Sequence, residues 1–195
     1  SVRLIASGSA ALQPRLSRVF WAAGIPVSEG YGLTETSPVI SVSRVNPPDF
    51  QVGCVGSLVD SIELKIAEDG EICVKGDSVM VGYYKNPEAT AEAIDPEGWF
   101  HTGDIGTMVD GKYLKITDRK KEIFKTSGGK YVAPQLVENK LKESAFIEQC
   151  MVVGEGQKFP SALIIPEFNA LQVWADQQEL GIKGPEELIK NPKVI

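Results

Sequence analysis

The sequence predicts a mixed α/β and α+β fold in which three stretches of different texture follow one another. Residues 1–35 carry the pattern of strand, helix and strand, residues from about 50 to 117 read mostly as strands, and an α+β pattern begins after Arg119. The chain has 195 residues and 43% hydrophobic residues, enough for the core of one full domain or two small ones.

The first stretch predicts the end of a larger α/β sheet. "VRLIAS" (2–7) reads as a buried strand. "LQPRLSRVFWAAG" (12–24) places apolar residues at helical spacing and ends on a glycine, so we expect a helix there. "IPVSEGYG" (25–32) then returns as a second strand and loop.

The second stretch is rich in strand signals. "SIELKIAEDGEICVKG" (61–76) alternates apolar and polar residues on both sides of Asp69-Gly70, a dipeptide typical of a hairpin turn. "EATAEAI" (88–94) predicts a short helix, and "DGKYLKI" (110–116) predicts another tight turn and strand.

The third stretch predicts an α+β module of its own. We expect a short strand pair around Ser127-Gly128-Gly129, helices at 134–143 and 169–180, and strands near 149–156 and 161–167.

The change of texture defines the expected domains. Residues 1–117 form one part, with an α/β portion at 1–49 and a β-rich portion at 50–117. Residues 118–121 are a short connector, and residues 122–195 form a separate small lobe.

Charge and composition exclude several classes of protein. Lys plus Arg is 20 against 26 Asp plus Glu, a net charge of −6, so we expect no nucleic-acid binding and only local anion sites. The three cysteines lack metal-ligand spacing and His101 is the single histidine, which argues against zinc sites and disulfides.

The sequence contains no apolar run of membrane-spanning length, and its start lacks the order of a signal peptide. We therefore expect a cytoplasmic protein. Peripheral membrane contact is compatible with the sequence, but no basic amphipathic helix indicates it. A start without methionine, directly on a strand, suggests a piece of a longer chain.

The segment "EGYGLTETSP" (29–38) is a glycine-containing loop with a hydroxyl beside a carboxylate. Such a loop can bring Thr34 to a phosphate while Glu35 holds Mg²⁺. The alternative is an ordinary turn in which Gly32 serves only to adopt positive φ, and composition alone favours this turn.

The segment "GWFHTGDIG" (98–106) predicts a loop that carries Asp104 after two aromatic residues of the core. One carboxylate can accept hydrogen bonds from both hydroxyls of a ribose. The alternative is an Asx turn before a strand. Without a nearby nucleophile, His101 is expected to be structural, and Cys73 is expected in the core.

The segment "TDRKKEIFKTSGGK" (117–130) surrounds a Ser-Gly-Gly turn with cations, namely Arg119, Lys120, Lys121, Lys125 and Lys130. The turn could cradle phosphates through backbone N–H groups. Taken alone, a solvated hairpin edge whose lysines discourage strand pairing is the more common arrangement.

The order of these segments resembles the adenylate-forming, AMP-binding superfamily of acyl-CoA synthetases, luciferases and peptide-synthetase adenylation domains. "ASGSAAL", "GYGLTETSP", "GEICVKGDSVMVGYYKNPEAT", "GWFHTGDIG" and "ITDRKKEIFKTSGGKYVAP" stand in the family's order over nearly the whole chain. Within the superfamily, "DRKKEIFKTSGGKYVAPQLVENKL" looks most like the long-chain fatty acyl-CoA synthetases.

The resemblance implies the acyl-CoA synthetase fold: the end of its large N-terminal α/β domain with the β-rich subdomain, a hinge, and an incomplete small α+β C-terminal domain. It implies an enzyme that joins a fatty acid to ATP, giving acyl-AMP and pyrophosphate, and passes the acyl group to coenzyme A. ATP, Mg²⁺, fatty acid and coenzyme A are the implied cofactors and small-molecule substrates.

The resemblance also implies roles for individual residues. Gly8, Ser9 and Ala10 would flank adenine, Tyr31 would stack on it, and Gly32 belongs to the phosphate loop. Thr34 would touch phosphate and Glu35 would hold Mg²⁺. Asp104 and Arg119 would hold the ribose hydroxyls, Lys121 would be the hinge, and Gly128 and Gly129 would line the pantetheine passage.

Some family features are expected to lie outside this sequence. The Gly, Ser and Thr-rich phosphate loop belongs upstream, and the catalytic lysine belongs beyond Ile195, so we expect no catalytic residue here and no activity from the chain alone. Ser9 and Ala10 stand where many relatives have glycine and proline. The alternatives are an adenylating ligase for an aryl or amino acid, or a non-enzymatic nucleotide-binding or interaction module.

Overall fold

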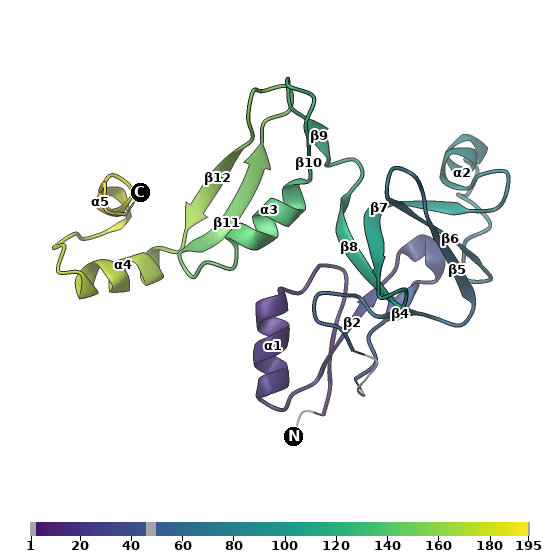
Figure 1. Cartoon of the computed structure of the whole chain (residues 1–195), viewed down its shortest axis with the longest axis horizontal. Coiled ribbons are helices and arrows are strands. Elements are labelled where there is room, and N and C mark those ends of the chain that lie inside the picture. The colour runs from purple at the N-terminus through teal and green to yellow at the C-terminus, as the bar shows by residue number, and fades with distance from the viewer. Residues whose placement is uncertain (1–2, 46–49, 195) are drawn as a thin grey trace. The chain divides into compact units, whose positions relative to one another are not determined.

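The computed structural model describes residues 3–45 and 50–194, which form two compact units (Figure 1). Unit 1 covers residues 1–122 and unit 2 covers residues 123–195. The predicted first strand and α/β portion include positions 1–2 and 46–49, which lie outside the described residues.

The first sheet of unit 1 confirms the predicted strand, helix and strand. β1 (Ile5–Ser7) and β2 (Val27–Tyr31) pair in parallel, and α1 (Pro14–Ala22) connects them. Proline at the first turn of α1 removes an N–H that would have no helical partner. The sheet continues in the order β1-β2-β3-β4 through two short antiparallel strands, β3 (Ser41–Val42) and β4 (Ser57–Leu58).

The second sheet of unit 1 is an antiparallel meander in the order β5-β6-β7-β8. Its strands are β5 (Ile62–Ile66), β6 (Glu71–Gly76), β7 (Phe100–Val109) and β8 (Tyr113–Arg119). Both predicted hairpins are confirmed. Gly70 has φ +87°, and Asp110 and Gly111 both have positive φ, as turns between paired strands require.

The helix predicted at 88–94 is α2 (Pro87–Ala93). Asn86 caps it, because its side-chain oxygen accepts from the backbone N–H of Ala89 at 3.1 Å.

The two sheets of unit 1 share one core. Its buried members are Ile40, Ile62, Ile72, Val74, Phe100 and Leu114. Backbone bonds from Val55 to Leu114 (2.8 Å) and from Leu114 to Gly56 (2.8 Å) tie the segment before β4 to β8. Cys73 is fully buried, as predicted.

The segment 98–106 is not the predicted loop, because Phe100–Val109 form the ten-residue strand β7. The buried positions of its first half alternate, but they are occupied by Phe100, Thr102, Asp104 and Gly106. A strand whose inner face carries a hydroxyl, a carboxylate and a glycine does not show the apolar alternation by which strands are recognised. Trp99 also departs from the prediction, since it is half-buried beneath the ammonium of Lys65, 4.5 Å from its ring centre.

The connector predicted at 118–121 begins within a strand. β8 extends through Arg119, and Asp118 is only 1% exposed. The backbone N–H of Glu122 donates to the carbonyl of Arg119 at 2.9 Å, which closes a turn after β8. The division between the two units falls after this turn, between Glu122 and Ile123.

Unit 2 confirms the predicted α+β module. α3 packs against β11 of the β11–β12 hairpin (Figure 1). The elements are β9 (Phe124–Lys125), β10 (Tyr131–Val132), α3 (Pro134–Leu141), β11 (Ile147–Val153), β12 (Ser161–Pro166), α4 (Phe168–Gln177) and α5 (Pro185–Leu188). The four-residue α5 was not predicted. Within residues 3–45 and 50–194, no helix has the length and apolarity to cross a membrane.

Gly56 supplies a test of the unit 1 packing. It has φ +90°, and a Cβ at this position would overlap backbone atoms of Val42 and Ser43. Gly56→Ala is therefore expected to cost more than the roughly 1 to 2 kcal/mol of left-handed backbone strain alone.

The matched control is Gly111→Ala, since Gly111 has φ +64° but open space around its Cβ position. Urea denaturation should show a clearly larger loss of unfolding free energy for Gly56→Ala. Equal losses would contradict the described packing.

Glu29 on β2 supplies a test of buried charge. It is 5% exposed, and its Oε1 has no hydrogen-bond partner among the described residues. Burial raises its pKa to about 7. Because the folded pKa lies above the unfolded value, the contribution of Glu29 to stability is fully present below the unfolded pKa and is lost as pH rises through the folded pKa of about 7.

The free energy of unfolding of Glu29→Gln at pH 8 is therefore expected to be about 2 to 3 kcal/mol higher than that of the wild type. The gain should shrink below about 1 kcal/mol at pH 5, where Glu29 is protonated in the folded state. Urea denaturation at both pH values, with the exposed Glu63→Gln as control, measures the difference. A gain that does not depend on pH would show that Glu29 is not buried as described.

Candidate functional site

Two loops leave the same edge of the first sheet. β1 and β2 are parallel, with Ser7 opposite Glu29, so the segments that follow them emerge side by side. A Cβ on Gly8 would lie 3.6 Å from the carbonyl oxygen of Gly30. The structure thus brings Gly8, Ser9 and Ala10, all exposed, close to the segment that begins at Tyr31.

The loop after β2 closes on itself. The Thr36 hydroxyl is buried, accepts from the N–H of Leu33 at 3.0 Å, and lies 3.1 Å from the carbonyl of Pro38. A Cβ on Gly32 would overlap the Pro38 carbonyl, and Gly32 does not have positive φ. The glycine is required for close approach of the backbone, so the idea that it serves only positive φ was wrong.

This closed loop presents Thr34 and Glu35 on a single turn of 3₁₀ helix, η1 (Thr34–Thr36). Thr34 is exposed. The Glu35 carbonyl accepts from the N–H of Met80 at 2.7 Å, and its Oε1 accepts from the Tyr83 hydroxyl at 2.9 Å. The loop is therefore fixed at both its backbone and its carboxylate.

Asp104 lies where the two sheets of unit 1 meet. It is 8% exposed, and its Oδ2 accepts from the Tyr31 hydroxyl at 2.7 Å. Arg119 is opposite it in register on β8, with Nε 3.7 Å from Oδ1. Burial raises the pKa of Asp104, although the Tyr31 hydrogen bond and the Arg119 charge oppose the rise. Residues from β2, β7 and β8 thus converge on one carboxylate.

A second polar cluster was not foreseen from the sequence. Its centre is Glu71, which is 5% exposed at the start of β6. His101 Nδ1 and Lys120 Nζ each lie 2.8 Å from Oε2, and the N–H of Gly103 donates to Oε1 at 3.1 Å. Lys120 also pairs with Asp69 at 2.7 Å. The signal in the sequence was a charged residue directly before the apolar run Ile72, Cys73 and Val74 of β6.

Glu71, Cys73 and His101 bring their donor atoms within 4.8 Å of one another, the spacing of a metal site. The Lys120 ammonium, however, rests on the carboxylate that such a metal would need. Burial also raises the pKa of the Cys73 thiol, which disfavours the thiolate that binds metals. The cluster is a hydrogen-bonded network in which His101 is structural.

In unit 2, Gly128 and Gly129 form the turn between β9 and β10. Gly129 has φ +83°, a left-handed conformation that favours glycine. A Cβ on Gly128 would meet no atom within 4 Å. The N–H of Ser127 donates to the Gln157 carbonyl at 2.9 Å, so this turn is joined to the β11–β12 turn.

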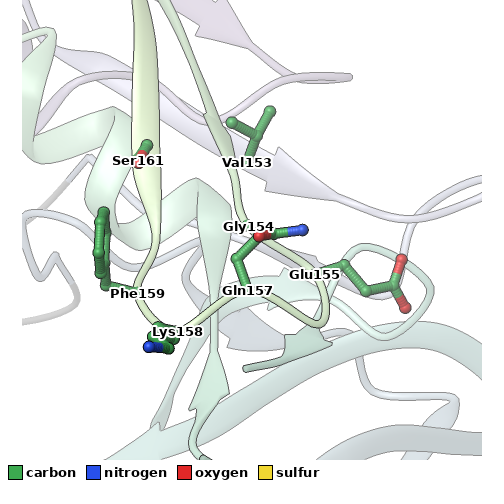
Figure 2. Close-up of a pocket in the computed structure, with 7 residues that line it drawn as sticks. All are labelled: Val153, Gly154, Glu155, Gln157, Lys158, Phe159 and Ser161. Carbon is green, nitrogen blue, oxygen red and sulfur yellow. The ribbon is translucent and has the colours of Figure 1, made fainter. Parts of the chain in front are cut away.

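A hollow of about 560 Å³ lies at the β11–β12 turn. Figure 2 shows the side chains that line it. The lining residues are Val153, Gly154, Glu155, Gln157, Lys158, Phe159 and Ser161.

In the predicted connector at 118–121, the predicted hinge residue Lys121 is exposed.

Two sequence models of known families match the chain. The model described as AMP-binding enzyme matches residues 1–84, and the model described as AMP-binding enzyme C-terminal domain matches residues 121–183. Together these ranges contain both loops of the first sheet and all of the β9–β10 turn.

Curated relatives are similar over most of the chain. The long-chain-fatty-acid–CoA ligase FadD15 of Mycobacterium bovis is 44% identical over 172 residues, which cover 88% of this chain and 28% of the relative. The peroxisomal long chain acyl-CoA synthetase 6 of Arabidopsis thaliana is 39% identical over 213 residues, with coverage of 99% and 30%. The chain thus spans less than a third of these relatives.

A solved structure has the same fold. The O-succinylbenzoate coenzyme A synthetase MenE of Bacillus subtilis, in complex with ATP and magnesium ion, superposes with a TM-score of 0.74 at 28% identity. The match covers 85% of this chain and 37% of that one. The sequence models, the relatives and the fold agree, and this chain belongs to the family of AMP-binding enzymes.

Proposed function

We propose that the intact protein that carries this chain is a long-chain fatty acid–CoA ligase. It joins a fatty acid to ATP, giving acyl-AMP and pyrophosphate, and then transfers the acyl group to coenzyme A. The observation that carries the proposal is the buried Asp104 carboxylate, which faces Tyr31 and Arg119 beside the two loops of the first sheet. Identities of 44% and 39% to long-chain ligases support the choice of substrate class.

In this proposal Asp104 and Arg119 hold the ribose of the nucleotide. One Asp104 oxygen accepts from Tyr31, but a carboxylate has about four lone-pair sites, so it can still accept from two adjacent hydroxyls. The Arg119 side chain is 64% exposed and can reach a ligand outside the protein surface.

The adenine would lie between the two loops of the first sheet. Because the Tyr31 hydroxyl is held by Asp104, the orientation of its ring is fixed, which suits stacking on a base. Gly8, Ser9 and Ala10 follow β1 at the same edge, and their exposure leaves them accessible to the base. Ser9 has φ +66°, so a serine adopts the left-handed backbone that glycine adopts more easily.

Thr34, next to Gly32 and the closed loop, would donate its hydroxyl to a phosphate. Glu35 offers a carboxylate, the hard oxygen ligand that Mg²⁺ prefers, and the Tyr83 hydrogen bond orients it. The Mg²⁺ ion supplies positive charge that neutralises phosphate oxygens. Glu35 is therefore the residue of this chain that would hold it.

Lys121 would act as the hinge about which the small lobe turns between the two half-reactions, and Gly128 and Gly129 would line the pantetheine passage. We also propose that the protein is cytoplasmic and binds no nucleic acid, given its net charge of −6. One relative, however, carries the word peroxisomal in its name.

An aryl acid is the second candidate substrate. MenE and the anthranilate CoA ligase AuaEII, whose names give aryl substrates, share the fold with TM-scores of 0.74 and 0.73. Their identities of 28% and 25% are lower than those of the long-chain ligases. Acid-dependent pyrophosphate release by the intact protein, compared between palmitate and benzoate, separates the two candidates.

The ribose role of Asp104 is tested by Asp104→Ala in the intact protein. Losing bonds to two hydroxyls is expected to weaken AMP binding by about 2 to 4 kcal/mol, as measured by titration calorimetry. Asp60→Ala, at an exposed position, is the control and should leave the affinity unchanged. AMP affinity that is equal in Asp104→Ala and wild type would remove Asp104 from the site.

The hinge role of Lys121 is tested by comparing Lys121→Pro with Lys121→Ala. Proline fixes φ, so it restricts rotation, whereas alanine removes only the side chain. Lys121→Pro should slow thioester formation at least tenfold more than adenylation, and Lys121→Ala should affect both steps alike. The measurement is the rate of adenylation and the rate of thioester formation, determined separately for each variant. Equal slowing of both steps in Lys121→Pro would exclude the hinge.

A further inference from the structure

We propose that Glu71 is a positioning residue that aims Asp104 at the ribose and fixes the chain just before Lys121. This inference rests on the proposed function, because Asp104 is its proposed ribose ligand. Glu71 lies outside the proposed nucleotide contacts, and it acts through Gly103 and Lys120.

The first step is the irregular pairing of β6 with β7. Glu71 is opposite Ile105 and Cys73 is opposite His101, so β7 has two extra residues between the paired positions. Gly103 lies in this bulge with φ +73° and precedes Asp104. Bulges turn the side chains that follow them, and here the bulge precedes the carboxylate that meets Tyr31.

The second step is that the bulge deprives Gly103 of ordinary strand partners. Its N–H donates to Glu71 Oε1 at 3.1 Å, so a side chain replaces a backbone acceptor. Its carbonyl accepts from the N–H of Lys120 at 2.8 Å, one residue beyond the end of β8. Both backbone groups of the residue before Asp104 are therefore held.

The third step is that Glu71 remains charged where it is buried. Burial would raise its pKa, but hydrogen bonds from His101 and Lys120 and the Lys120 charge bring the pKa below its usual value. An ionised carboxylate is a stronger acceptor for the Gly103 N–H than a neutral one. The surrounding donors thus keep Glu71 in the state that holds the bulge.

The fourth step concerns the chain before Lys121. Lys120 is held at two points, by its N–H on Gly103 and by its ammonium on Glu71, at 2.8 Å each. Its pKa is raised by its hydrogen bonds to Asp69 and Glu71, so the ammonium stays charged. Rotation about Lys121 can then leave Lys120 and Arg119 in place.

The experiment compares Glu71→Met with Glu71→Gln in the intact protein. Both side chains have the length of glutamate, but only glutamine keeps an oxygen that can accept from Gly103. Asp69→Asn is the control, since it removes the charge that pairs with Lys120 but keeps an oxygen that can accept from the N–H of Glu71. Amide hydrogen exchange is read at Gly103, Lys120 and Leu114, and affinities are measured for AMP and 2′,3′-dideoxy-AMP.

In Glu71→Met, Gly103 exchange should be at least tenfold faster, with Leu114 unchanged as the marker of global stability. AMP affinity should fall five- to tenfold, and affinity for the dideoxy analogue should change less than twofold. In Glu71→Gln, the exchange rate at Gly103 should stay within threefold of wild type, because the glutamine oxygen can still accept from its N–H. The exchange rate at Lys120 should rise at least fivefold, because its ammonium loses one of its two carboxylate partners. Asp69→Asn should leave the exchange rate at Gly103 and the AMP affinity within twofold of wild type.

Equal acceleration of Gly103 and Leu114 in Glu71→Met would overturn the proposal, because Glu71 would then serve only overall stability. If Glu71→Met does not fold, Glu71→Gln alone tests the proposal. Equal increases in the exchange rates at Gly103 and Lys120 in that variant would overturn the proposal. A wild type that does not bind AMP would refute the proposed nucleotide site, and the exchange results would still decide whether Glu71 holds Gly103.

Discussion

The burial of the Asp104 carboxylate is the constraint on which unit 1 and its candidate site both depend. A carboxylate that is 8% exposed is stable only when hydrogen bonds replace its water. The Tyr31 hydroxyl supplies one at 2.7 Å, and Tyr31 belongs to the first sheet while Asp104 belongs to the second. The contact that compensates the buried charge therefore also joins the sheets, and it places the carboxylate beside the loops that follow β1 and β2.

Three buried carboxylates of unit 1 show how hydrogen-bond donors and nearby cations determine the pKa of a buried acid. Glu29, with an unpartnered oxygen, has a pKa of about 7. Asp104, with one hydroxyl and a more distant cation, has a raised pKa, since burial still outweighs its partners. Glu71, with two cationic or imidazole partners and a backbone N–H, has a lowered pKa. The direction of the pKa shift thus follows the donors around each carboxylate: the pKa is raised where burial dominates and lowered where cationic and N–H donors surround the group.

Sequence patterns predicted the elements whose apolar residues repeat regularly. α1, the β5–β6 hairpin and α3 were placed within a few residues because their sequences carry regular apolar spacing and clear turn signals. The spacing marks these elements even though apolar residues of both helices, such as Val19 and Leu136, are exposed. β7 was missed because its inner face is polar, and that same polarity makes it part of the candidate site. The resemblance to a family identified Asp104, whereas the Glu71 network joins positions from 71 to 120, which no local pattern connects.

Three consecutive residues after the buried Asp118 differ in how firmly they are held, and this ordering bears on how a two-step enzyme could work. Arg119 is the last residue of β8, so its backbone belongs to the sheet. Lys120 is outside the strand but is held by Gly103 and Glu71. Lys121 is exposed, and the division into units follows one residue later. A ligand to the ribose must stay in place through both half-reactions, whereas a hinge must move between them. If Arg119 is the ribose ligand and Lys121 the hinge, as proposed, these residues meet the opposite demands because the firmly held Lys120 lies between them.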